Sequence, residues 1–134
     1  MSHFSEFSCR MTSEKYLIAA LEEMGFVGKL EVFQVPTQLY GYQGDKRPQK
    51  AHIIIRRQHV GSASNDIGFE RMADGTFKIY ISDYDKTKYN NKWIEKLKTT
   101  YSYLKINDTA KKRGYSTSME KKGDKVVLTL SRWN

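Results

Sequence analysis

Hydrophobic residues recur at two different spacings along the chain, and the wider spacing predicts two helices. Between Ser13 and Gly25 the apolar positions lie three or four residues apart, on one helical face: Leu17, Ala20, Leu21 and Met24. Thr12 or Ser13 can cap the start of this helix and Gly25 can end it. Asn90 or Asn91 can cap a second helix, whose similar stripe continues toward Gly114: Trp93, Leu97, Tyr101 and Leu104. It predicts one long helix, or two helices with a break near Asn107.

The other apolar segments are short or alternate with polar residues, which is typical of β-strands. The seven predicted strands cover residues 3–10, 27–35, 51–58, 67–72, 76–82, 115–121 and 125–133. Three consecutive isoleucines at 53–55 favour a strand buried on both faces, in the middle of a sheet. Pro36 is expected to end the second strand, so residues 37–49 are expected to form a loop. Asp74-Gly75 and Gly123-Asp124 each predict the turn of a hairpin.

The order of these elements predicts the fold class. It reads strand, helix, strand, then several strands, then helix and two strands. Two helices with single apolar stripes can both cover one face of a sheet. We therefore predict an α+β protein, a two-layer sandwich of a mostly antiparallel sheet with two main helices packed on one face. A length of 134 residues and the lack of a linker predict a single domain over residues 1–134.

The net charge of +8 is unevenly distributed along the chain. Residues 46–58 carry five cations and no acid, and residues 86–113 carry nine cations against two acids. This asymmetry favours a polyanionic or acidic partner, although lysines can also do no more than solvate a helix. One cysteine, Cys9, and no apolar run long enough to cross a bilayer favour a cytoplasmic protein without a membrane segment.

The loop and strand over residues 40–57 are the first candidate site, for an anion. Gly41 and Gly44 are expected to free backbone amides, and nearby cations would add charge. The predicted anion-binding set is Tyr40, Gly41, Tyr42, Gly44, Lys46, Arg47, Lys50, Arg56 and Arg57. A secondary basic face is expected on the long helix, at Lys92, Lys96 and Lys98. The alternative is an ordinary surface loop whose tyrosines pack on the sheet. The spacing matches neither a Walker loop nor a dinucleotide fingerprint.

Tyrosines among the cations extend this hypothesis to nucleic acid. Aromatic rings beside lysine and arginine hold single strands by stacking on their bases. The candidates are Tyr40, Tyr42, Tyr80, Tyr84, Tyr89 and Tyr103. The alternative is that most of these rings are half-buried at the sheet edge, since tyrosine is amphipathic.

Other kinds of chemistry find little support in the sequence. Asp83 and Asp85, with Asp66, could bind a divalent cation, but acids at a strand end more often begin a turn. The histidines lack metal-ligand spacing, and His52 is expected to be packed in its strand. We find no nucleophile motif. The sequence therefore predicts no metal, no cofactor and no catalytic residue. An enzyme that uses Asp83, Asp85 or His52 is the least favoured alternative.

Several separated blocks of residues resemble a known family. These are Met1-Ser2-His3-Phe4-Ser5, the block Leu39–Asp45, the block Asn65–Phe69 and the terminal Leu128–Trp133. Together they resemble the hypothetical chloroplast open reading frame 35 family, a domain of unknown function in algal plastids, cyanobacteria, other bacteria and phages. The resemblance implies a compact domain, a stromal location in plastid relatives, and an accessory role, because bacterial relatives are sometimes encoded beside an AAA-type ATPase and a ferredoxin.

Two functions from different classes follow from these observations. The first is a small basic, non-enzymatic binding module that contacts nucleic acid or a nucleotide through residues 40–57. The alternative is an adaptor or regulatory subunit that docks on a protein such as an AAA-type ATPase or, in a phage, a host defence protein. A basic helix can face an acidic protein as readily as a phosphate chain.

Overall fold

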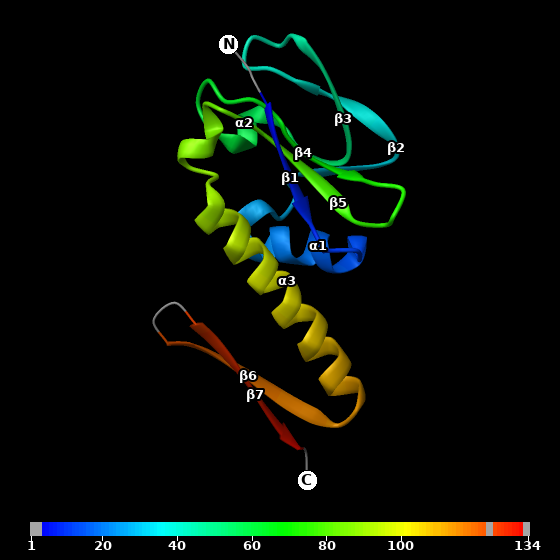
Figure 1. The fold of residues 1–134 in the computed structure, drawn as a ribbon, viewed down its shortest axis with the longest axis vertical. Helices are drawn as coiled ribbons and strands as arrows, with labels where there is room; N and C mark the ends of the chain where they lie inside the picture. The colour runs from blue at the N-terminus through cyan, green and yellow to red at the C-terminus, as the bar shows by residue number, and fades with distance from the viewer. Residues whose placement is uncertain (1–3, 123–124, 133–134) are drawn as a thin grey trace.

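The protein is described by a computed structural model that covers residues 4–122 and 125–132. Five strands form an antiparallel sheet in the order β1-β5-β4-β3-β2, and two more form a separate hairpin (Figure 1). The strands are β1 (Phe4–Cys9), β2 (Leu30–Tyr40), β3 (Lys46–Ile55), β4 (Ile67–Arg71), β5 (Phe77–Ser82), β6 (Tyr115–Lys122) and β7 (Lys125–Arg132). The helices are α1 (Glu14–Leu21), η1 (Glu22–Phe26), α2 (Arg57–Val60), η2 (Asp85–Thr87) and α3 (Asn91–Lys112).

Helices α1 and α3 cover one face of the large sheet and enclose the main core. The buried residues that meet there are Leu17 and Leu21 of α1, Ile94, Leu97 and Tyr101 of α3, and Ile53, Ile55, Phe69, Phe77 and Ile79 of the strands. The side chain of Asn90 caps α3, and the helix continues unbroken past Asn107. The predicted α+β class, with a mostly antiparallel sheet and two main helices on one face, is confirmed.

A smaller core lies on the opposite face of the sheet. The β2–β3 hairpin bends over this face, because its register shifts twice between Val32 and Tyr40. Buried residues from four strands meet under the hairpin: Phe4, Leu39, Ala51, Ile54 and Tyr80. Gly68 on β4 allows the close approach, since a Cβ atom there would lie 2.7 Å from the Ala51 Cβ and 2.8 Å from the Leu39 Cδ2.

Three expectations about the strands are wrong. Pro36 does not end β2 but lies within it, where β2 is an edge strand and its register with β3 is interrupted. The expected loop over residues 37–49 is therefore only a turn between Tyr40 and Lys46. The central strand ends at Ile55 and not at residue 58, because α2 begins at Arg57.

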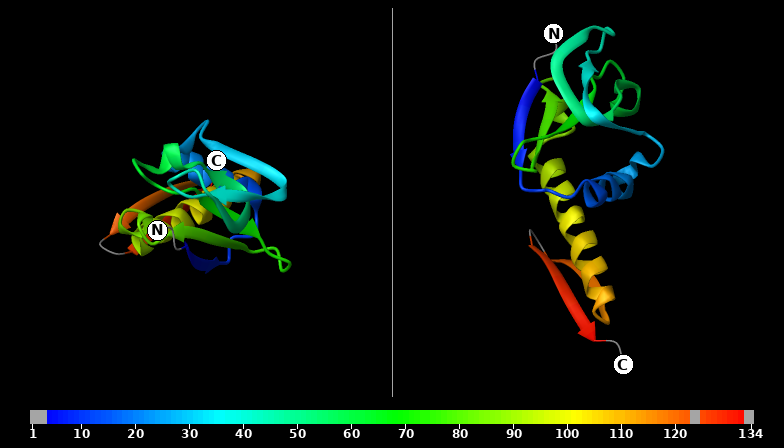
Figure 2. Two further views of the ribbon diagram at one scale, coloured as in Figure 1. Left: turned by 90° about the horizontal axis from the view of Figure 1, so that it is seen from above. Right: turned by 90° about the vertical axis from the view of Figure 1, so that its right-hand side faces the viewer.

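The final hairpin stands apart from the large sheet. Strands β6 and β7 pair only with each other and pack against α3. The second half of α3 and this hairpin extend from the body of the molecule (Figures 1 and 2). We call this part, residues 102–122 and 125–132, the arm. Among the described residues, no helix is long and apolar enough to cross a membrane.

Candidate functional site

A buried carboxylate, Asp66, organises the region between β3 and β4. Its side chain is 1% exposed and accepts hydrogen bonds through both oxygens. Oδ2 accepts from the backbone N–H of Tyr40 at 2.7 Å and from Arg56 Nη1 at 2.8 Å, and Oδ1 accepts from the backbone N–H of Arg57 at 2.7 Å. The backbone N–H of Asp66 in turn donates to the Tyr40 carbonyl at 3.0 Å. Asp66 therefore fixes the end of β2, the start of α2 and its own loop in one arrangement.

A second buried carboxylate, Asp85, continues this network toward η2. Its Oδ2 accepts from Ser82 Oγ at 2.7 Å and from the backbone N–H of Asn65 at 3.0 Å. The side-chain amide of Asn65 donates to Ser82 Oγ at 2.9 Å, while its carbonyl oxygen accepts from the backbone N–H of Tyr42 at 2.8 Å. Asp85 is only 4% exposed, so these contacts hold its carboxylate in place at low dielectric.

Two of the blocks that carry the family resemblance meet in this network. Leu39–Asp45 and Asn65–Phe69 are joined by the Tyr40–Asp66 and Tyr42–Asn65 hydrogen bonds. The amides of Gly41 and Gly44 are not free as expected, because they donate to the carbonyls of Asp45 and Gly41 within the turn. This turn therefore supports the neighbouring loop and does not present a cradle of backbone N–H groups.

Arg56 and Arg57 of the predicted anion-binding set also make internal contacts. The Arg56 guanidinium is 15% exposed, pairs with Asp66 and with Glu31 at 3.0 Å, and lies 5.6 Å from the centre of the Tyr40 ring. Arg57 Nη1 donates to the Tyr42 carbonyl at 3.0 Å. Both side chains therefore have partners within the fold.

The other predicted cations lie at the surface but in two places. Lys46 and Lys50 are exposed on β3, whereas Arg47 pairs with Asp45 at 3.3 Å and lies over the Phe4 ring. On α3, Lys92 and Lys96 are exposed and Lys98 pairs with Glu95 at 3.5 Å. The β2–β3 hairpin and α3 cover opposite faces of the sheet. The two basic segments therefore do not form one continuous patch.

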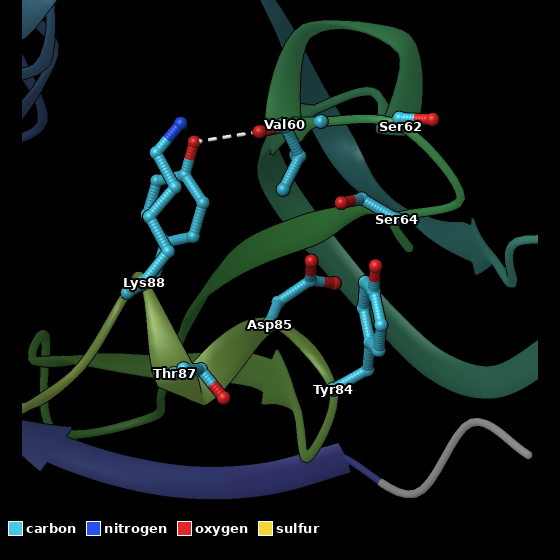
Figure 3. Close-up of a pocket in the computed structure, with 9 residues that line it drawn as sticks. Val60, Ser62, Ser64, Tyr84, Asp85, Thr87 and Lys88 are labelled. Carbon is cyan, nitrogen blue, oxygen red and sulfur yellow. Dashed lines mark hydrogen bonds between the residues drawn. The ribbon is translucent and has the colours of Figure 1, made fainter.

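An open cavity of about 550 Å³ lies on the far side of the Asn65–Asp85 network (Figure 3). The loop at residues 61–64 forms one wall, and residues 84–89 form the other. Asp85, Tyr84 and Ser64 point toward the space between these walls (Figure 3). The Tyr89 hydroxyl closes one side by donating to the Val60 carbonyl at 2.8 Å. This volume is within the usual range of small-ligand sites, about 300–1,000 Å³.

The loop at residues 61–64 is held in an unusual conformation. Ala63 has a φ of 57°, in the left-handed region that residues other than glycine seldom adopt. The backbone N–H of Ser64 donates to the Gly61 carbonyl at 3.3 Å, which tightens the turn. A Cβ atom on Gly61 would lie 2.8 Å from Ser64 Oγ. The small residues of this loop therefore allow a tight turn, and Ser64 lines the cavity.

The cavity combines one fixed negative group with a positive and an aromatic group. Asp85 Oδ2 is occupied by Asn65 and Ser82, and among the described residues no donor contacts Oδ1. Lys88 Nζ lies 5.5 Å from the centre of the Tyr89 ring. Burial, with the nearby charge of Asp85, raises the pKa of the Tyr89 hydroxyl, which stays protonated as a donor. Tyr84 is 60% exposed. Such groups can bind a polar ligand with hydroxyl, anionic and flat parts.

Sequence reasoning found only part of this site. Tyr84 and Tyr89 were among the stacking candidates, and Asp66 and Asp85 were considered as cation ligands. In the described residues, no group of three or more acidic, histidine or cysteine side chains could hold a metal ion. Ser62, Ser64 and Lys88 were missed. The only sequence signal of the two serines is the run of small residues at 61–64 between two strongly apolar segments, which marks a tight loop rather than a function. Lys88 belongs to the basic segment at residues 86–113.

Comparison with curated proteins gave no match, and comparison with solved structures gave none either. One family model does match the chain, over residues 20–130, and its description is "Protein of unknown function (DUF1257)". The matched region includes both walls of the cavity, the Asn65–Asp85 network and most of the arm. Because the match covers most of its length, the chain belongs to the DUF1257 family.

Proposed function

We propose that the protein is a small binding module that holds a nucleotide unit, either free or within a single strand of nucleic acid, in the cavity between residues 61–64 and 84–89. The observation that carries this proposal is the Asp85 carboxylate. It is buried, it is fixed through Oδ2 by Asn65 and Ser82, and it lines an open cavity. A preorganised acceptor of this kind costs little reorganisation when a ligand binds.

The acceptor at Asp85 suits the donors of a nucleotide. A carboxylate forms strong, charge-assisted hydrogen bonds to hydroxyl and amino groups. The ribose of a free nucleotide supplies vicinal hydroxyls, a ribose within an RNA strand supplies its 2′-hydroxyl, and most bases supply an amino group. The hydroxyl of Ser64, on the opposite wall, can donate or accept at the same ligand.

Tyr84 supplies a surface for the base. Its side chain lines the cavity and is 60% exposed. Stacking of a base on an exposed tyrosine contributes about 1–3 kcal/mol, and every base has a flat face to offer. The site would therefore bind with little preference for sequence.

Lys88 and the hydroxyl of Ser62 can hold the phosphate. Both line the cavity, Ser62 on the loop at residues 61–64 and Lys88 on the opposite wall (Figure 3). Lysine acts on phosphate as a point charge, so affinity should fall as salt is added. The binding site proposed here differs from the predicted loop at residues 40–57. That loop contributes indirectly, since the Tyr42–Asn65 hydrogen bond supports the cavity floor.

The test is an equilibrium titration at about 50 and 200 mM salt, with adenosine monophosphate by calorimetry and a labelled oligouridine by fluorescence anisotropy. We expect Tyr84→Ala to weaken binding by roughly 5- to 150-fold, the equivalent of one stacked base, and Tyr84→Phe to preserve it. Lys88→Gln should weaken binding and flatten its salt dependence. Lys92→Gln is the matched control, because this lysine is exposed on α3 and does not line the cavity.

Two results would overturn the proposal. One is the absence of binding to either probe at low salt. The other is binding that survives the combined Tyr84→Ala and Lys88→Gln changes. Binding of the oligouridine without binding of the monophosphate would identify a nucleic-acid strand as the ligand, and the reverse would identify a free nucleotide.

The narrower resemblance to the chloroplast open reading frame 35 family belongs to this proposal as well. The proposal also includes a cytoplasmic location, or a stromal one in plastid relatives. It further includes the occurrence of relatives in cyanobacteria and phages. An accessory role beside a protein partner is compatible with the cavity, because the arm lies at the other end of α3.

A further inference from the structure

A second cavity lies on the arm, between α3 and the start of β6. Its volume is about 640 Å³. Residues of α3 line it at intervals of three and one, which places them along a single helical face: Ser102, Lys105, Ile106, Thr109, Ala110 and Arg113. Tyr115, at the start of β6, lines the other side. The cavity is therefore a groove along one face of the helix.

The groove has an apolar floor and a positive rim. Ala110 and Tyr101 are buried at its base, and Ile106 is a large apolar side chain that is 38% exposed. Lys105 and Arg113 are both exposed on this face, about two helical turns apart. No ion pair within the described part of the chain engages either of them. Asp108, the acid of this helix segment, instead pairs with Lys112 and with Tyr16 of α1.

The hairpin of the arm packs against fewer elements than the strands of the large sheet do. A two-stranded hairpin is marginally stable alone and requires a further layer to pack against. Here that layer is a single helix face, since β6 and β7 pack against α3 and do not join the large sheet. Residues 105–132 also carry eight cations against three acids. The arm therefore combines exposed apolar surface with most of the net charge of the chain.

We propose that this groove docks an acidic segment of a partner protein, with at least one apolar side chain seated on Ile106 and Ala110 and carboxylates facing Lys105 and Arg113. Charge complementarity selects an acidic partner. The aliphatic floor selects a protein over a nucleic acid, because the rings at the groove are not free for base stacking. Tyr101 is 5% exposed, and the Tyr115 ring is half-buried with Arg132 5.9 Å from its centre. Amphipathic helices are recognised in this way, through anchors at helical spacing.

The probe is a labelled synthetic peptide of about 15 residues, with leucines at helical spacing and glutamates between them. Fluorescence anisotropy at about 150 mM salt measures its affinity. We expect a second peptide, with serine in place of every leucine and the same charge, to bind at least about tenfold more weakly. Ile106→Ser and the pair Lys105→Gln, Arg113→Gln should each weaken binding of the leucine peptide. All three side chains are exposed, so these variants should fold. Lys92→Gln is the matched charge control.

Three outcomes would overturn this inference. The serine peptide could bind as tightly as the leucine peptide, which would indicate non-specific attraction. Ile106→Ser could leave binding unchanged. An oligouridine could displace the peptide and lose its own affinity in the Lys105→Gln, Arg113→Gln variant, which would assign the arm to nucleic acid. Tyr84→Ala should have no effect on peptide binding, so failure of the groove and failure of the nucleotide cavity are distinguishable.

Discussion

The backbone N–H of Tyr40 donates to the buried carboxylate of Asp66 at 2.7 Å, across 26 positions of the chain. This contact, together with the return hydrogen bond from Asp66 N–H to the Tyr40 carbonyl, fastens the end of β2 to the loop before β4. Asn65, the residue before Asp66, donates its backbone N–H to Asp85 on the cavity floor. The shape of the proposed nucleotide site therefore depends on a hydrogen-bond network that begins outside it.

Removal of the Asp66 carboxylate should strongly destabilise the fold. Asp66→Ala leaves the Arg56 guanidinium and two backbone N–H groups without their acceptor, and breaking a buried pair costs about 3–5 kcal/mol. The free energy of unfolding in urea measures this loss. Asp45→Ala is the control, because the Asp45–Arg47 pair is partly exposed and should contribute at most about 1 kcal/mol. Equal effects of the two changes would contradict the central role of Asp66.

Gly68→Ala should destabilise the second core by overpacking. The new Cβ would lie 2.7 Å from the Ala51 Cβ and 2.8 Å from the Leu39 Cδ2, and both neighbours are fully buried. Such overlap costs about 1–3 kcal/mol. Adding Leu39→Ala should remove part of the clash, so the double variant should be more stable than the sum of the two single changes predicts. Urea unfolding of all four proteins measures this coupling, and strict additivity would show that the two side chains do not meet.

The local features of the fold were predictable from the sequence, and its long-range contacts were not. The stripe from Leu17 to Met24 and the asparagine cap of α3 are encoded within a few residues, so both helices were found. The turn at Asp74-Gly75 was found for the same reason. Pro36 misled the prediction, because a proline interrupts a central strand and is tolerated in an edge strand, and strand order is not a local property.

The candidate site was harder to predict than the fold, because it is built from contacts between residues that are distant in the sequence. Nothing near Asp66 or Asp85 in the sequence indicates that they are buried acceptors, because the partners Tyr40 and Asn65 lie 26 and 20 positions away from them. Cations at 46–57 and 92–98 were both candidates for a basic surface, and the hairpin and α3 lie on opposite faces of the sheet. Charge counted along a chain does not report which side of a sheet each segment covers.

Stability should fall on mild acidification because of His52. Burial, with the nearby positive charge of Arg71, lowers the pKa of His52, which is neutral when its Nδ1 accepts the Arg71 backbone N–H at 2.9 Å. In the unfolded chain its pKa returns to about 6.5, so the unfolded state binds the proton more readily. Stability is therefore present above about pH 6.5 and decreases as the pH falls below it.

Thermal melts at about pH 7.5 and 5.5 measure the His52 effect. His52→Gln should reduce the difference between the two melting temperatures. His59→Gln is the matched control, because this second histidine is exposed on α2 and should leave the difference unchanged. If the pH dependence persisted in His52→Gln and disappeared in His59→Gln, the titrating residue would be His59, and this prediction would be wrong.

We expect the Tyr101 hydroxyl to hold the start of α1 against α3. It accepts hydrogen bonds from the backbone N–H groups of Thr12 and Ser13 at 3.2 and 2.9 Å, and its ring packs edge-on against Tyr16. Tyr101→Phe keeps the ring but leaves two partly buried donors unpaired, at a cost of about 1–3 kcal/mol. Hydrogen exchange should show faster exchange of the Thr12 and Ser13 amides, ahead of any change in the sheet. Tyr103→Phe is the control, since no hydrogen bond of its hydroxyl is found among the described residues. Unchanged exchange at Thr12 and Ser13 in Tyr101→Phe would mean that the core packing of Leu17 and Leu21 alone holds α1 in place.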